Sequence, residues 1–237
     1  MEEPRYIAEA QVEAGKRPKK WEGTVHYNRE SPQLTKRLAP IGPSGVLAIG
    51  FGIAEWVYWR YSDLAKNRDP LLFIEAAWAF EIDPAYTKIW NKALEDRPKD
   101  AVGGPLFAMK GLVASLLYAE RARRKSPEHS GGGPARHVVE LAFLARYALP
   151  NVRPFDGWLQ DVLNKFQRMY PKLPKARYGE PVPRELLDPE AEYKKAEIPT
   201  LLDAFLKSLD YRKNSYLRSP KEMEAEGFVG TPYRYSR

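Results

Sequence analysis

Residues 44–61 read Ser-Gly-Val-Leu-Ala-Ile-Gly-Phe-Gly-Ile-Ala-Glu-Trp-Val-Tyr-Trp-Arg-Tyr, and this stretch decides the fold. Ser44 can cap a helix that starts there, and apolar side chains occupy every face of that helix, with Glu55 and Arg60 as its only charges. A membrane span needs about 20 apolar residues, whereas prolines precede this run and Glu55 interrupts it. We therefore predict that it forms the central helix of a soluble core.

Two Asp-Pro pairs follow the central helix, at residues 69–70 and 83–84. Each pair offers a carboxylate for the N-cap and a proline for the first helical position, where its missing N–H costs nothing. We expect short helices over Leu71–Phe80 and Ala85–Leu94. Their apolar stripes would pack against the central helix.

Longer segments with helical spacing of apolar residues come next. They predict one helix from Gly103 to about Lys125 and a second, strongly apolar one over Pro134–Leu149. Residues 126–133 between them end in Ser-Gly-Gly-Gly, which is typical of a flexible linker. Since the second helix needs burial on most sides, we expect it to pack against the central helix in a single core that spans the linker.

The rest of the chain completes an all-α prediction. Amphipathic helices are expected over Pro154–Tyr170 and from Pro199 to Leu209, and a short charged helix after Asp188-Pro189. No segment shows the sustained alternation of a strand, so we predict one globular domain of six to eight helices. Residues 1–43 would form an irregular N-terminal arm over the core, 44–210 the helical core domain, and 211–237 an extended C-terminal tail.

Composition narrows the class of protein. The 237 residues are 43% hydrophobic, which is ample for a sizeable core, and they include no cysteine. The absence of cysteine excludes disulfides, thiolate nucleophiles and Cys-ligated metals. The first residues, Met-Glu-Glu-Pro, lack the basic and then apolar pattern of a signal peptide, so we expect a cytoplasmic protein that is not embedded in a membrane.

Motifs for metals and phosphates are weak. His137 and Glu140 share a helix face, but a di-metal bundle site needs Glu three residues before His on each of two helices. The Ser-Gly-Gly-Gly run lacks the Lys-Ser/Thr of a Walker loop and no strand precedes it. We therefore predict no metal site and no cofactor.

Carboxylates on apolar helices are the remaining candidates for acid–base chemistry. Glu55, Glu75 and Glu140 fit that description. The competing interpretation is structural, since Arg136 lies four residues before Glu140 and can pair with it. We assign no catalytic residue.

The run Gly52-Ile-Ala-Glu-Trp-Val-Tyr-Trp-Arg60, followed by Ile74-Glu-Ala-Ala-Trp78 and Asp83-Pro84, resembles the helical immunity proteins that bacteria encode beside secreted interbacterial toxins. The resemblance covers residues 44–95 and lies in general character, because these proteins share no common motif. It implies a non-enzymatic inhibitor that binds its cognate toxin. The net charge of +7 departs from the acidic character of many such inhibitors that target nucleases.

A basic protein suits an acidic partner or a nucleic acid. The basic residues are mixed with nearly as many acids, so we expect no specific nucleic-acid binding. Arginine and tyrosine are enriched at protein interface hot spots. We predict that a protein with an acidic surface binds residues of these two types outside the core: Arg121, Arg123 and Arg124 at a helix end, and Tyr211, Arg212, Tyr216, Arg218, Tyr233 and Arg234 in the tail. The alternatives are a helical nucleic-acid-binding or phage-related protein, and an enzyme with an unrecognised carboxylate site.

Overall fold

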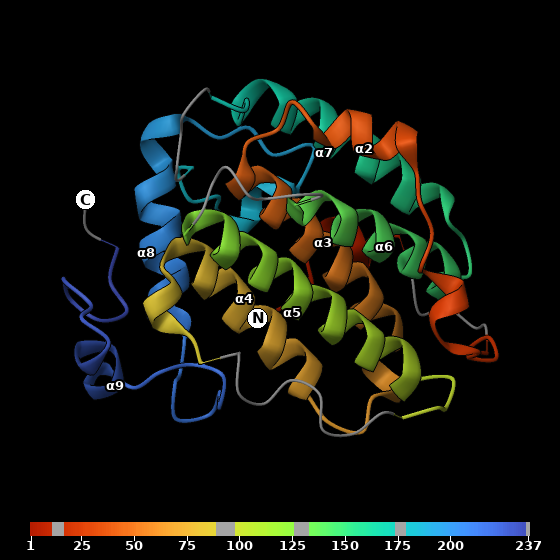
Figure 1. Ribbon diagram of the computed structural model, residues 1–237, viewed down its shortest axis with the longest axis horizontal. Helices are drawn as coiled ribbons and strands as arrows, with labels where there is room; N and C mark the ends of the chain where they lie inside the picture. The colour runs from red at the N-terminus through yellow and green to blue at the C-terminus, as the bar shows by residue number, and fades with distance from the viewer. Residues whose placement is uncertain (11–16, 89–97, 126–132, 174–178, 236–237) are drawn as a thin grey trace.

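The computed structural model describes residues 1–10, 17–88, 98–125, 133–173 and 179–235. Within these ranges the chain forms nine α-helices, seven of them with seven or more residues, joined by loops and short 3-10 turns (Figure 1). Its only β contacts there are two isolated bridges, one of which pairs Ile41 with Pro171. The predicted all-α fold is confirmed. None of the described helices combines the length and the apolarity that crossing a membrane requires.

The central helix is α3, Pro43–Tyr61. Every residue in it is buried except Pro43 and Trp59, as expected for a helix that is apolar all round. Its N-cap is Gly42 with proline at the next position, so the prediction that Ser44 caps the helix is wrong by two residues. Ser44 is buried inside the first turn instead.

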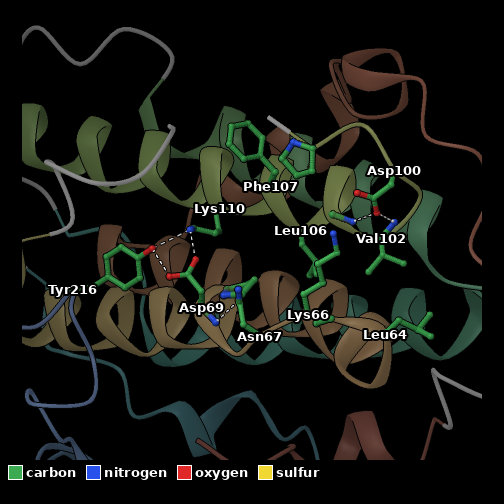
Figure 2. A pocket seen from close by; sticks show the side chains of 14 residues that line it. Leu64, Lys66, Asn67, Asp69, Asp100, Val102, Leu106, Phe107, Lys110 and Tyr216 are labelled. Carbon is green, nitrogen blue, oxygen red and sulfur yellow. Dashed lines mark hydrogen bonds and ion pairs between the residues drawn. The ribbon is translucent and has the colours of Figure 1, made fainter. Parts of the chain in front are cut away.

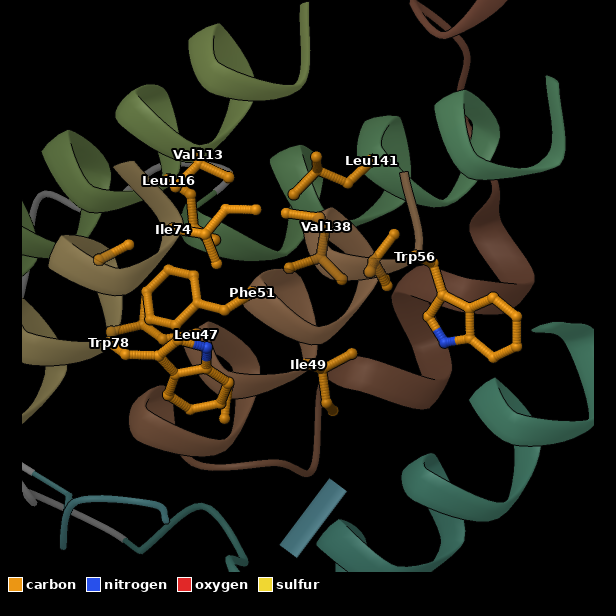
Figure 3. Packing of buried hydrophobic residues seen from close by; sticks show 14 of the residues in the cluster. Leu47, Ile49, Phe51, Trp56, Ile74, Trp78, Val113, Leu116, Val138 and Leu141 are labelled. Atoms are coloured by element: carbon orange, nitrogen blue, oxygen red, sulfur yellow. The ribbon is translucent and has the colours of Figure 1, made fainter. Parts of the chain in front are cut away.

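Three helices pack against one side of α3: α4 (Asp69–Ile82), α5 (Gly103–Lys125) and α6 (Gly133–Ala148). Close approach is possible because Gly50 has no side chain; a Cβ there would lie 2.5 Å from Leu116 of α5 and 3.3 Å from Val138 of α6. Figure 3 shows these side chains meeting around Phe51, whose ring packs edge-on against Trp78 of α4 at 5.2 Å. The predicted packing of α6 on the central helix is therefore confirmed.

The opposite side of α3 is covered by α7 (Arg153–Met169) and the 3-10 turn η6 (Arg184–Leu187). Trp158 of α7 donates its indole N–H to the carbonyl of Leu187, 2.8 Å away, and so ties the two elements together. Both side chains pack where Gly52 leaves room, since a Cβ there would lie 2.6 Å from the Leu187 methyl carbon.

The two ends of the chain also join this core. The N-terminal arm contains α1 (Arg5–Ala8), the 3-10 turn η1 (Gly23–His26) and α2 (Pro32–Leu38). It lies over the core as expected, and its described residues bury four apolar side chains there, Ile7, Leu34, Leu38 and Ile41. After α8 (Ile198–Ser208), the predicted extended tail instead forms α9 (Pro220–Ala225) and buries Tyr216, Leu217 and Met223. The prediction of an extended tail is therefore wrong.

Two predicted helices differ from the structure. The one expected over Ala85–Leu94 stops after the 3-10 turn η3 (Pro84–Tyr86), because Thr87 is extended and pairs with Leu217 of the tail; residues 89–94 of that prediction lie outside the described residues. After Asp188 the chain makes a turn, in which the carboxylate accepts a bond from the Glu190 N–H. Its next helical residues belong to the 3-10 turn η7 (Lys195–Glu197), which leads into α8. Residues 126–132 of the predicted linker also lie outside the description.

Candidate functional site

Helices α4 and α5 run parallel, and a cavity lies at each end of the pair. At their N-terminal ends Lys110 of α5 bonds to Asp69 of α4, and at their C-terminal ends the Arg124 guanidinium lies 5.3 Å from the centre of the Phe80 ring. We call the hollow beside Asp69, of about 520 Å³, the N-end cavity. The hollow beside Arg124, of about 600 Å³, is the C-end cavity.

The C-end cavity brings together two segments that the sequence analysis singled out separately. Arg121, Arg124 and Lys125 line it from the last turns of α5, and Tyr235 lines it from the C-terminal tail. The tail is held there because the Tyr235 N–H donates to the carboxylate of Asp203 on α8, at 3.1 Å. A cationic helix end and a tyrosine-rich tail thus share one wall, although they are over 80 residues apart in the chain.

Two of the predicted arginines are engaged within α5. The Nε of Arg123 lies 2.6 Å from one oxygen of Glu120, and the Nε of Arg124 lies 2.8 Å from the other. Glu120 is buried, so these guanidinium groups compensate a carboxylate that would otherwise be costly to bury. Arg121 has an exposed position on the cavity wall.

The tail residues of the predicted interface divide in a similar way. Tyr216 is only 4% exposed, so the expectation that it lies outside the core is wrong. Arg218 donates to the carbonyls of the 3-10 turn η3 and pairs with Glu226 at 3.2 Å, which fastens the tail to the core. On the surface, Tyr211 stacks on Tyr233 with 5.8 Å between ring centres.

The other two predicted arginines of the tail, Arg212 and Arg234, are exposed. Arg212 lies with its guanidinium 5.7 Å from the centre of the Tyr211 ring, and Arg234 lies 3.6 Å from Asp203. The tail therefore keeps Tyr211, Arg212, Tyr233 and Arg234 at least partly exposed, while the tail residue that lines the C-end cavity is Tyr235.

Glu81, at the end of α4, is the least expected group in the C-end cavity. Both of its oxygens accept from the Val182 N–H, at 3.2 and 3.1 Å. Burial raises the pKa of this carboxyl to about 8, and the Val182 N–H and the positive charge of Arg124 oppose that rise only in part. Sequence reasoning missed Glu81 because its burial depends on a loop a hundred residues away.

The raised pKa of Glu81 predicts a specific dependence of stability on pH. Unfolding returns the carboxyl to its ordinary pKa of 4.5, so the native state binds more protons than the unfolded state between pH 4.5 and about 8. This group therefore makes stability fall as pH rises through that window, with a slope of at most about 1.4 kcal/mol per pH unit. Urea unfolding of wild type and Glu81→Gln at several pH values should show a smaller fall in the variant. Parallel profiles would contradict the assignment.

Two of the carboxylates considered for catalysis are held in buried pairs. Glu55 accepts from Arg184 in a bidentate arrangement, with bonds of 2.6 to 3.0 Å, and from the Trp78 indole at 2.8 Å. Glu75 accepts from the terminal amine of the chain at 3.1 Å and from Asn214 at 2.9 Å. Their partners come from remote segments, which spacing along the chain does not reveal.

Glu140 is also paired, as the structural interpretation predicted. It accepts from Arg136 at 3.2 Å, and its other oxygen lies 3.0 Å from the Nδ1 of His137. Among the described residues no three acidic or imidazole side chains gather as a metal site would need. The geometry of Glu140 is that of a local ion pair on one face of α6.

The N-end cavity holds a different cluster, shown in Figure 2. The hydroxyl of Tyr216 donates to Asp69 at 2.7 Å, while the ammonium of Lys110 donates to Asp69 and, at 2.9 Å, to Tyr216. Asp69 was expected to cap α4, but its side chain makes no cap bond, and Arg68 occupies the N-cap position. That prediction is wrong, because the carboxylate bonds to α5 and the tail instead.

Comparisons of the chain with protein-family models, with curated proteins and with solved structures found no match. The C-end cavity is lined by Arg121 and Arg124 of the predicted interface together with Tyr235 of the tail, and it is our candidate interaction site. Of the predicted tail residues, Tyr216 lines the N-end cavity instead.

Proposed function

We propose that the protein acts without catalysis, by binding another protein and blocking it. The contact surface is the C-end cavity with its neighbouring tail residues. The observation that carries the proposal is the meeting of Arg121 and Lys125 of α5 with Tyr235 of the tail around one hollow. The residues that carry most of the binding energy in a protein interface cluster together. Two segments rich in arginine and tyrosine that meet at one place therefore fit an interaction surface.

The chemistry of this surface suits an acidic partner. Arg121, Lys125 and Arg212 are exposed cations, and arginine binds carboxylates in bidentate fashion. The stacked rings of Tyr211 and Tyr233 add rigid amphipathic area at small cost in side-chain entropy. The finer hypothesis, an immunity protein that neutralises a cognate bacterial toxin in the cytoplasm, rests on the resemblance of residues 44–95 to that class.

Charge reversal is expected to slow formation of this complex. With a partner captured from the source cell and then purified, the double variant Arg121→Glu/Lys125→Glu should associate about tenfold more slowly at low salt, with a smaller change in the dissociation rate. Arg212→Glu tests the tail separately. Stopped-flow association at several salt concentrations measures both, and the difference from wild type should shrink as salt screens the charges.

The matched control is Arg168→Glu, which reverses an exposed charge in the last turn of α7 and so has the same unfavourable effect on a helix C-terminus. It should leave association unchanged. Deleting the tail is unsuitable as a test, because Leu217 and Met223 are part of the core. Association that is equal in all variants would refute the surface, and turnover of a metabolite by the purified protein alone would refute the blocking role.

A further inference from the structure

The N-end cavity has the form of a small-molecule site, at the other end of α4 and α5 from the proposed partner surface. Its volume of about 520 Å³ falls within the range of ligand pockets, roughly 300–1,000 Å³. Much of its wall is apolar, with Leu106 and Phe107 contributed by α5. Leu64, also on the wall, is 49% exposed, so apolar surface at the mouth of the cavity remains in contact with water.

The polar groups of the cavity converge at one end. Figure 2 shows Asp69, Lys110 and Tyr216 close together at one side of the cavity. Asp100 lies at the opposite side, and Leu106 and Phe107 lie between the two sides. The Lys110 side chain is 12% exposed and its ammonium is bonded to its two neighbours, whereas the Asp69 side chain is 41% exposed. A carboxylate has about four lone-pair sites, so Asp69 can accept a further hydrogen bond from the cavity side.

Charge in the cavity is balanced. Its described wall carries two lysines, Lys66 and Lys110, and two aspartates, Asp69 and Asp100, so the net charge of these side chains is zero. The carboxylate of Asp100 already accepts hydrogen bonds at the start of α5, from the N–H groups of Val102 at 3.0 Å and Gly103 at 2.7 Å. These bonds lower the pKa of Asp100. A charged ligand would lose hydration without meeting a net opposite charge, which disfavours it relative to a neutral one.

We propose that the N-end cavity binds a neutral small molecule that has an apolar body and a hydroxyl head, with the body against Leu64 and Phe107 and the hydroxyl donating to Asp69. The contacts among Asp69, Lys110 and Tyr216 preorganise the acceptor, because the carboxylate is already fixed by two donors. The same contacts would also anchor the tail if no ligand bound, so the test must measure binding directly.

Benzyl alcohol is a suitable probe, since it joins one ring to one hydroxyl. Titrated into the full chain and followed by amide NMR shifts, it should perturb residues around Val102 to Lys110 with a dissociation constant of about 1 mM, as eight non-hydrogen atoms permit. Toluene, which lacks the hydroxyl, should bind about tenfold more weakly. Benzoate and benzylammonium, each with one charge, should also bind more weakly than the alcohol.

Variants separate the two parts of the site. Asp69→Asn should weaken benzyl alcohol several-fold and leave toluene unchanged, whereas Leu64→Ser should weaken both probes. Tyr118→Ala is the matched control, because Tyr118 is a large exposed side chain of α5 outside the cavity. If Asp69→Asn fails to fold, the relative affinities of the four probes for the wild-type protein still test whether the cavity prefers a neutral ligand with a hydroxyl group. No shift up to about 20 mM, shifts elsewhere in the molecule, or equal binding of the alcohol and toluene would overturn the proposal.

Discussion

Arg184→Met is expected to lower the free energy of unfolding by about 3–5 kcal/mol. Glu55 is fully buried in the middle of α3, and Arg184 of the turn η6 supplies its only cationic partner among the described contacts. Removing the guanidinium leaves a carboxylate in the core with one remaining bond, from the Trp78 indole. The same guanidinium also donates to the carbonyl of Glu2 at 2.7 Å, so the N-terminal arm loses an attachment as well.

The double variant Glu55→Met/Arg184→Met separates loss of the pair from exposure of an unpaired charge. Replacing a buried ion pair by apolar residues of similar size is often neutral or stabilising, so the double variant should recover most of the lost stability. Urea unfolding of the two variants provides the measurement, with Arg153→Met, an exposed position on α7, as the surface control. A double variant as unstable as Arg184→Met would mean that packing, rather than charge, dominates at this position.

The helices whose burial is visible in their own periodicity were predictable from sequence. The predicted limits Gly103 and Lys125 are those of α5, and α7 and α8 begin and end one residue before their predicted limits. Such segments carry the signal within themselves, because one apolar face repeats every three to four residues. The packing of α3 against α6 was correctly expected for a different reason, because both segments are apolar on most of their faces and need burial on most sides.

The Asp-Pro signal was less reliable. It starts a true helix at residues 69–70 but only a single 3-10 turn at 83–84, and a turn without a helix at 188–189. Asp followed by Pro satisfies a helix start and a tight turn equally well, so the local sequence does not distinguish them. At 83–84 the outcome is set by Leu217, which pairs with Thr87 from the other end of the chain.

The candidate sites depend even more on remote contacts. The Arg184 partner of Glu55 is 129 residues away, and the Lys110 partner of Asp69 is 41 residues away, so neither pair follows from spacing. The engagement of Arg123 and Arg124, in contrast, has a local signal. Glu120 precedes them by three and four residues, the spacing at which side chains meet on a helix. By that rule the local sequence already pairs both arginines with Glu120.

Trp56→Ala is expected to cost about 3–5 kcal/mol, the range for removing a large aromatic side chain from a core. Trp56 is 1% exposed and is the point at which three segments of the chain meet. Its ring lies edge-on to Phe155 at 5.6 Å, and at 5.8 Å from Trp158, both on α7, while Tyr6 of the N-terminal arm lies 6.1 Å away. Loss of the ring therefore leaves a cavity between α3, α7 and the N-terminal arm, and these three elements cannot all shift to fill it.

Trp59→Ala is the matched control for that loss, since it removes the same side chain three residues further along α3 at a partly exposed position. It should cost clearly less, because much of the space left by Trp59 can fill with water rather than remain as a void. Thermal and urea unfolding of both variants measure the difference. A Trp56→Ala protein no less stable than Trp59→Ala would show that α7 and the N-terminal arm contribute little to holding α3, and that the core is organised by α4, α5 and α6 alone.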